Sequence, residues 1–420
     1  MKHAEVAVVG GGIAGLIAAV ALARRGLRPT LFETAHEFGG RAQTRVVDGF
    51  HFNQGPHALY IGGAFHAALS AFGLAAPGRR LSLANALALW EAGDHPLPTG
   101  LVRGQAAPPL SAADADDLAE AFAAVAAGAG EAGTPLRAFT GTLSPAVRMV
   151  VEAFVRLSTY AHAPEDIDAK AALDQQRLSF SGVIYVDGGW RALVSQLVDA
   201  ATTAGVRLRA EHRVGAIRRE GRTWQVDLAD GATEAFEAVI LAASPAAASE
   251  LVEGAQTVVA AARATRPVRT MGLDLGLAGV APGPEYALGM DVPLYMSLHS
   301  AVADLAPPGG GLLHLGRYLA PDEAPDAGHI KALEQLADRL QPGWRDRLVH
   351  RQRLVGITVA HDLPHWRSGG RRAPVVVPDA PGLFLAGDWV GDEGLLSDAS
   401  AASAVVAARE AAAFLSGVPA

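Results

Sequence analysis

The hydrophobic pattern of the chain alternates between short apolar runs, typical of buried strands, and longer segments in which apolar residues recur at helical spacing. Apolar runs bounded by glycine or charged residues predict strands over 6–9, 28–32 and 383–386. Helical segments are expected over 64–74, 111–127, 144–160, 164–176 and 329–340. Ser111 is suited to an N-cap and Pro145 to a first helical position, which supports two of these helices.

The strands expected in the C-terminal half have a different pattern. Small or polar residues alternate with apolar ones over 269–277, 294–300 and 311–319, as in a half-buried antiparallel sheet. A further strand is expected over 354–360. With 420 residues, the chain is long enough for two joined domains of mixed α/β structure, each with its own core.

The first apolar strand leads into a glycine turn and an apolar helix, in the run VAVVGGGIAGL over 6–16. Gly10, Gly12 and Gly15 fit G-x-G-x-x-G, with Ala14 inside the motif. The first glycine allows a tight turn, the second lets backbone approach a pyrophosphate, and the third lets helix and strand pack closely. Glu33, which follows the second strand, is placed to accept hydrogen bonds from a ribose diol. The pattern predicts a dinucleotide site, but it does not separate NAD from FAD.

Two further segments add to this site. The pair Gly39-Gly40 would let the chain cross the dinucleotide closely, and the Arg41 guanidinium that follows could pair with a phosphate. Near the C-terminus, Gly387 and Asp388 follow a short apolar strand and precede a helix expected from about residue 397. An aspartate there can accept a hydrogen bond from a sugar or ribityl hydroxyl.

Taken together, these segments resemble the flavoprotein superfamily of flavin-containing amine oxidases, protoporphyrinogen oxidases and phytoene-type desaturases. The segment YVDGGWRALVSQLVDAATTAGVRLRAEHRVGAI, over 185–217, also resembles this superfamily. The resemblance implies FAD as cofactor, with the backbone of Val214 toward the adenine. It also implies that the turn at Gly55 and Pro56 lies beside the flavin ring, and that Leu395 and Leu396 occupy the matching C-terminal position near the flavin.

The resemblance further implies a Rossmann-type FAD-binding domain with an interleaved α+β substrate domain, built from an antiparallel sheet and helices. We assign the FAD-binding domain to 1–60, 181–265 and 371–420, and the substrate domain to 61–180 and 266–370.

Composition narrows the function. The formal net charge is −8 with no basic block, which argues against a nucleic-acid partner. The chain has no cysteine, which excludes disulfides, thiolate metal ligands and a cysteinyl flavin link, so FAD is expected to bind non-covalently. A histidyl flavin link stays open as an alternative. Neither a signal peptide nor a transmembrane segment fits the sequence, and a cytoplasmic location is expected. Peripheral membrane contact stays open.

Candidate catalytic residues are few, because the flavin carries the chemistry. His57 follows the turn expected beside the flavin ring, and Trp389 follows Asp388. The alternatives are a histidine bonded to backbone and a buried core tryptophan. No metal is expected, because Pro364 breaks the only suggestive cluster, AHDLPHW over 360–366.

The substrate is inferred from departures from the amine oxidase pattern. The aromatic residue that often follows the C-terminal glycine is replaced by Leu395 and Leu396. The chain's lysines, Lys2, Lys170 and Lys331, lie on no strand expected beside the flavin. Both departures favour a desaturase or dehydrogenase acting on an apolar, isoprenoid- or polyene-like small molecule. An amine or amino-acid oxidase that releases hydrogen peroxide, and a redox-neutral isomerase, stay as alternatives. The electron acceptor could be oxygen, a quinone or another oxidant.

A largely apolar substrate pocket is expected between segments 61–180 and 266–370. Its candidate lining residues lie at strand-like spacings: Met271, Leu273, Leu294, Tyr295, Met296, Leu298, Leu313 and Leu315. The alternative is that these residues form the core of the second domain, because period-two alternation does not say which face is covered.

Overall fold

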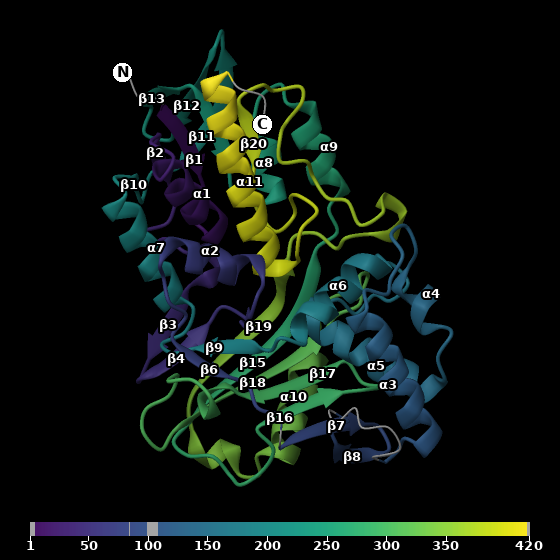
Figure 1. The fold of residues 1–420 in the computed structure, drawn as a ribbon. Coiled ribbons are helices and arrows are strands. Elements are labelled where there is room, and N and C mark those ends of the chain that lie inside the picture. Colours follow the sequence, from purple (N-terminus) through teal and green to yellow (C-terminus); the bar gives the residue numbers. More distant parts are fainter. Residues whose placement is uncertain (1–4, 84, 99–107, 418–420) are drawn as a thin grey trace.

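The structure, a computed structural model, describes residues 5–83, 85–98 and 108–417 (Figure 1). One end of the molecule is built on a five-stranded parallel sheet of order β10-β2-β1-β14-β20. These strands are Arg207–Arg209, Arg28–Phe32, Glu5–Val9, Ala238–Leu241 and Leu383–Leu385, respectively. The central strands are apolar along their length because helices or a second sheet cover both faces.

Each face of this sheet has its own core. On one face, Val6 and Val8 pack in a cluster with α1 (Ile13–Ala23), α7 (Arg191–Thr203) and α11 (Leu396–Ser416). The short helix α2 (Ala64–Phe72) joins this cluster. On the other face, Ala7 and Val9 pack in a second cluster that involves an antiparallel sheet and two helices. These elements are β11 (Val214–Glu220), β12 (Thr223–Leu228), β13 (Thr233–Phe236), α8 (Pro245–Leu251) and α9 (Gln256–Ala264).

The other end of the molecule is built on a seven-stranded sheet of order β19-β15-β18-β17-β16-β7-β8 (Figure 1). Its strands are Leu348–Ala360, Val268–Leu277, Gly311–Tyr318, Leu294–Leu298, Tyr286–Gly289, Ala86–Trp90 and Gly93–Pro96, respectively. All neighbouring pairs are antiparallel except β16 with β7. One face packs against α10 (Ala327–Leu340). Helices α3 (Ala112–Ala126), α4 (Leu136–Thr140), α5 (Pro145–Thr159) and α6 (Ala169–Ser179) share a core with the opposite face.

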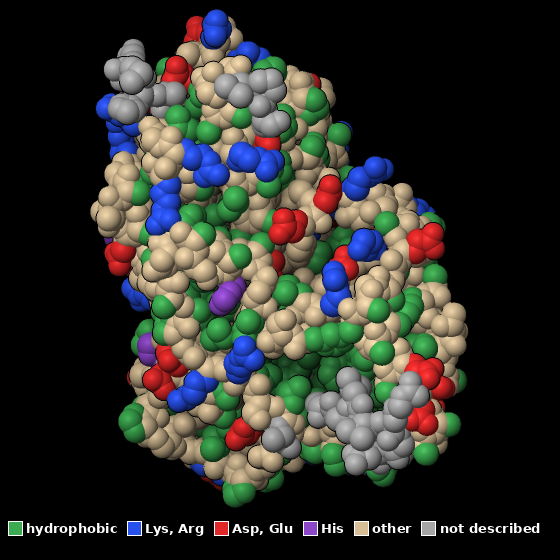
Figure 2. Space-filling view, in the orientation of Figure 1, with side chains coloured by type: hydrophobic (Ala, Val, Ile, Leu, Met, Phe, Trp, Pro, Cys, Tyr) green, Lys and Arg blue, Asp and Glu red, His purple; other side chains and the backbone are tan. Residues whose placement is uncertain are grey.

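Short elements connect the two ends. A two-stranded sheet is formed by β3 (Thr44–Val47) and β4 (Phe50–Asn53), and a three-stranded sheet by β5 (Leu59–Tyr60), β9 (Val183–Val186) and β6 (Gly78–Arg80). Four short 3₁₀ helices span Gly40–Ala42, His299–Ala301, Trp344–Arg347 and Trp366–Ser368. Acidic and basic side chains are interspersed on the face shown in Figure 2.

Most expected elements are present, although some bounds differ and some short elements were not expected. The helix expected from 164 begins at Ala169, because the Asp168 side chain caps it by accepting a hydrogen bond from the Ala171 N–H. The strand expected from 354 begins at Leu348, and β16 was not expected. Within the described residues no helix is long and apolar enough to cross a membrane. The cytoplasmic location and the domain boundaries stay predictions.

The expected lining of the substrate pocket is largely wrong. Leu273, Met296, Leu298, Leu313 and Leu315 lie in the core formed with α10, and Leu294 packs against that core. These residues therefore form a hydrophobic core between the seven-stranded sheet and α10, in agreement with the alternative interpretation that they are core residues. Only Met271 and Tyr295 of the expected set line a cavity. The sheet face that carries Tyr295 also carries Tyr286, Tyr318, His314, Gly272 and Gly316.

Candidate functional site

A cavity of about 430 Å³ lies at the carboxyl ends of the parallel strands. Gly10, Glu33, Ala242 and Gly387 line it, and they follow β1, β2, β14 and β20 closely. The carboxyl edge of a parallel sheet, where crossover connections run in opposite directions from neighbouring strands, is where α/β folds bind ligands.

The glycine turn between β1 and α1 leaves room only where a ligand could use it. A Cβ on Gly10 would lie 2.5 Å from Ala242 O, and a Cβ on Gly15 would lie 1.8 Å from Gly10 O. A Cβ on Gly12 would meet no protein atom within 4 Å, so that side of the turn is open. Gly12 is the N-cap of α1, with no side-chain cap and no acidic residue in the first turn. Free N–H groups and the positive helix end therefore remain to bind an anion.

Glu33 is held in a fixed position at the end of β2. Its Oε2 accepts a hydrogen bond from Gly11 N at 2.7 Å, and its Oε1 accepts one from Ala35 N at 2.8 Å. Each carboxylate oxygen can accept a further hydrogen bond, as the predicted contact to a ribose requires.

The glycine pair predicted to cross the dinucleotide lies directly beside the first turn. Gly39 has a φ of 117° and donates its N–H to Gly11 O at 2.8 Å. A Cβ on Gly40 would have Gly12 Cα, at 3.6 Å, as its only neighbour within 4 Å. Two bare backbone segments thus border the same part of the cavity.

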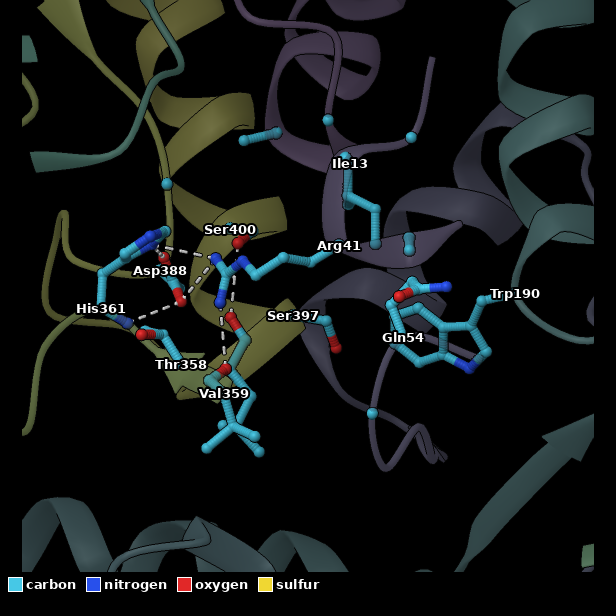
Figure 3. A pocket seen from close by; sticks show the side chains of 18 of the residues that line it. Ile13, Arg41, Gln54, Trp190, Thr358, Val359, His361, Asp388, Ser397 and Ser400 are labelled. Carbon is cyan, nitrogen blue, oxygen red and sulfur yellow. Dashed lines mark hydrogen bonds and ion pairs between the residues drawn. The ribbon is translucent and has the colours of Figure 1, made fainter. Parts of the chain in front are cut away.

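Arg41, Asp388 and His361 form a cluster in the cavity wall (Figure 3). Arg41 Nη2 lies 2.8 Å from Asp388 Oδ2, and His361 Nδ1 lies 2.8 Å from Asp388 Oδ1. Burial alone would raise the pKa of Asp388, but the Arg41 charge and the His361 hydrogen bond hold that pKa well below its usual range. Asp388 therefore stays ionised. His361 belongs to this cluster, and no group of residues suited to a metal occurs in the described part of the chain.

His57 lines the cavity, but both of its ring nitrogens contact backbone carbonyls. Nδ1 lies 2.7 Å from Gly55 O, and Nε2 lies 3.1 Å from Arg41 O. Burial lowers the pKa of His57 to about 4, which keeps the ring neutral. This geometry matches the backbone-bonded alternative and offers no free nitrogen for proton abstraction.

Trp389 does not line the cavity. Its ring is fully buried among the residues packed on β14 and β20, and its Nε1 donates to Ala243 O at 3.0 Å. The structure therefore places it as the buried core tryptophan of the alternative interpretation, and its catalytic role stays a prediction.

The other predicted residues divide between the cavity wall and its support. Ala14, Gly55, Pro56 and Leu396 line the cavity. Gly15 supports the site indirectly, because its lack of a side chain lets α1 pack closely against the turn at Gly10. Val214 and Leu395 are buried and lie outside the cavity lining, so their contacts to FAD stay predictions.

Several lining residues were not predicted individually, although Gln54 and Trp190 adjoin glycines that the sequence analysis singled out. They are Gln54, Tyr60, Tyr160, Trp190, Thr358, Ser397 and Ser400. In Figure 3, Trp190 and Gln54 lie across the cavity from His361 and Asp388. Ser397 and Ser400 could have been expected, since they begin the helix that follows Asp388.

The residues present fit FAD. The open side at Gly12, the uncapped helix end and the fixed carboxylate of Glu33 are what a pyrophosphate and its ribose need. The indole Nε1 of Trp190, a lining residue, is buried without a hydrogen-bond partner among the described residues, which is consistent with a ligand acceptor nearby.

Known proteins resemble the chain in two ways, by short matches in sequence and by a likeness of the whole fold. Carotenoid 3,4-desaturase of Haloarcula japonica is 44% identical over 69 residues, which are 16% of this chain and 14% of that protein. The 4,4'-diaponeurosporene-forming 4,4'-diapophytoene desaturase of Staphylococcus haemolyticus is 43% identical over 56 residues, 13% of this chain and 11% of that protein. The match thus spans only a small part of each relative.

A crystal structure of an oxidoreductase from Methanosarcina mazei superimposes with a TM-score of 0.77 at 18% identity. The superposition covers 97% of this chain and 100% of that chain. At this identity the likeness supports the fold alone, and it confirms the expected α/β architecture.

The family model for flavin containing amine oxidoreductases matches residues 13–274, more than half of the chain. The match confirms the family and FAD cofactor that the glycine motifs predicted. The chain therefore belongs to the flavin containing amine oxidoreductase family and is an FAD-dependent oxidoreductase.

Proposed function

We propose that the protein is a dehydrogenase of desaturase type, which oxidises a carbon–carbon bond of an apolar, isoprenoid- or polyene-like substrate. The observation that carries the proposal is the cavity wall next to the seven-stranded sheet. Pro56, Ala58, Tyr160 and Leu396 line that part and bring no charge, and the Arg41 guanidinium next to Val359 is neutralised by Asp388. The lining carboxylates, Glu33 and Asp388, are held by backbone N–H groups and by Arg41, respectively.

The residues of this cavity wall are less suited to binding an amine substrate. The contacting aromatic pair within the lining, His57 and Trp190, meets at 65° and forms no parallel clamp. Leu396 stands where an aromatic residue is typical of amine oxidases. The two named desaturases act on carotenoid or diapophytoene, and their short similarity to this chain points the same way.

FAD, when bound, accepts a hydride at N5. The chain's own part is to bind, orient and exclude water. The glycine turns and Glu33 hold the nucleotide end, while the apolar wall would position the substrate and keep water from the reacting carbon.

The test is anaerobic bleaching of the purified holoprotein. The absorbance spectrum should be that of a flavoprotein, and heat or acid should release free FAD. 4,4'-Diapophytoene in detergent micelles should bleach the flavin, and an aliphatic diamine should not. Anaerobic bleaching by the amine, followed by peroxide release when oxygen is admitted, would establish the oxidase alternative. Rearrangement of the polyene without net bleaching would establish an isomerase.

A further inference from the structure

The sheet face turned away from α10 carries a buried histidine–aspartate pair. His314 on β18 and Asp274 on β15 are direct cross-strand partners, and His314 Nδ1 bonds Asp274 Oδ1. The two side chains are 4% and 7% exposed, respectively. Asp274 Oδ2 accepts a second hydrogen bond, at 2.9 Å, from Gln352 Nε2, so the carboxylate is fixed at both oxygens.

The opposite edge of the His314 ring is left uncovered by two glycines. Gly272 and Gly316 are cross-strand partners beside it. A Cβ on Gly316 would lie 3.8 Å from His314 Nε2, and a Cβ on Gly272 would lie 3.6 Å from its Cε1. Larger residues there would crowd this edge of the ring.

His314 lines a second, small cavity of about 10 Å³, close to the space that one water molecule needs. Tyr295, Thr270 and Tyr318 line it too. Pro56 and Tyr160 line both this cavity and the main one, so the two adjoin at the uncharged end of the FAD site.

Oxidation of a carbon–carbon bond to a double bond removes two hydrogens. One leaves with its electron pair for the flavin, and the other leaves as a proton that needs an acceptor. Among the described residues that line the two cavities, both ring nitrogens of His57 contact backbone carbonyls, while Asp388 and His361 are bonded to each other beside the Arg41 charge. Glu33 lies at the nucleotide end.

We propose that Nε2 of His314 accepts this proton from the substrate through one water molecule in the small cavity. The C–H electron pair that the proton leaves behind becomes the second bond of the alkene, and the hydride from the neighbouring carbon reduces FAD. Asp274 acts as the positioning residue: it fixes the proton on Nδ1 and stabilises the imidazolium. The proposal rests on the proposed function.

The surroundings of His314 tolerate a positive ring. The His299 ring stacks on it with centroids 5.3 Å apart. Burial keeps the pKa of His299 well below its usual value, so that ring stays neutral. The other titratable or charged groups around His314 are its partner Asp274, His57, and the residues that share the small cavity, Tyr160, Tyr295, Arg317 and Tyr318.

The first test is the rate of anaerobic flavin bleaching by 4,4'-diapophytoene in the FAD-loaded protein. His314→Gln should slow bleaching by about 100-fold or more, with FAD affinity unchanged. The pH inflection of the wild-type rate should disappear in that variant. His51→Gln, which changes a half-buried histidine outside both cavity linings, should behave as wild type. An unchanged rate in His314→Gln overturns the proposal.

Two further measurements keep the test decisive. If His314→Gln loses FAD or unfolds, Asp274→Asn takes its place, with a slower rate expected and an unchanged rate overturning the proposal. Nitrogen NMR of ¹⁵N-histidine-labelled holoprotein needs no substrate. It should show Nδ1 protonated and Nε2 unprotonated for the ring whose signals vanish in His314→Gln. The reverse tautomer overturns the proposal. If 4,4'-diapophytoene fails to bleach the wild type, the proposed function fails with that substrate, while the NMR result still decides the state of His314.

Discussion

Arg41 Nη2 and Asp388 Oδ2 lie 2.8 Å apart although 347 residues separate them in sequence. The contact joins the glycine pair that follows β2 to the end of β20. Asp388 is buried, while the Arg41 side chain is 44% exposed, so the arginine can shift without losing all hydration. The sequence predicts that Arg41 pairs with a phosphate and that Asp388 accepts a hydrogen bond from a sugar or ribityl hydroxyl. In the structure the two side chains form an ion pair with each other.

Asp388→Asn removes the negative charge and keeps the shape of the side chain. We expect the free energy of unfolding to fall by about 1–3 kcal/mol, as for a lost charged hydrogen bond. The ion pair gives its full stability above the carboxyl's ordinary pKa and loses it progressively as pH falls toward the depressed pKa of Asp388, so the difference between the two proteins should shrink at low pH. Urea unfolding of both proteins at several pH values measures this. An equal deficit at every pH would show that the ion pair is not its source.

The nucleotide site was largely predictable because its signal is local. Gly10, Gly12 and Glu33 lie within one strand–helix–strand unit, where spacing alone fixes their relative positions. Asp388 was predictable as a strand end. Its contact with His361 was not, since the histidine lies at the end of a strand from the other sheet.

The substrate side was less predictable for a different reason. The alternation of apolar with small or polar residues identifies the two faces of β15 and β18, but it does not say which face α10 covers. The predicted pocket residues are therefore mostly leucines of the covered face. The pairing of Asp274 with His314 depends on strand register, which nothing in either strand's sequence specifies.

Substitutions at Gly12 and at Gly15 should differ in their effects: the first should weaken FAD binding alone, and the second should also lower stability. Gly12→Val should nearly abolish FAD binding and leave apo-protein stability within about 1 kcal/mol, because the new side chain enters open space next to extended backbone. Gly15→Ala should lower stability as well, because its Cβ would overlap Gly10 O. FAD titration and urea unfolding of both variants make the comparison. Tight FAD binding by Gly12→Val would remove this turn from the pyrophosphate site.

Glu33 should contribute through its charge. Glu33→Ala is expected to weaken FAD binding by about 1–3 kcal/mol, since charged hydrogen bonds to the ribose are lost. Glu33→Gln keeps one acceptor oxygen and should lose less. Titration of apo-protein with FAD gives both values. Equal affinity in Glu33→Ala and wild type would place the ribose elsewhere.

Asp398 should limit stability at neutral pH. It lies in the first turn of α11, where Oδ1 accepts the N–H of Phe65 at 2.8 Å and Oδ2 has no partner among the described residues. Burial raises its pKa from 3.8 to about 6. The folded protein therefore binds the proton more tightly than the unfolded chain between these values, so this group's contribution to stability falls as pH rises from about 4 to about 6.

Asp398→Asn removes this effect while keeping an acceptor for Phe65. We expect the variant to match wild type below pH 4 and to exceed it by about 3 kcal/mol above pH 6, at 1.36 kcal/mol per pKa unit. Asp362, whose pKa burial also raises to about 6, contributes equally to both proteins and cancels in the difference. Urea unfolding across this pH range gives the difference directly. A variant less stable than wild type at pH 7 would mean that the ionised carboxylate, through Phe65 and the N-terminus of α2, stabilises the fold despite its burial.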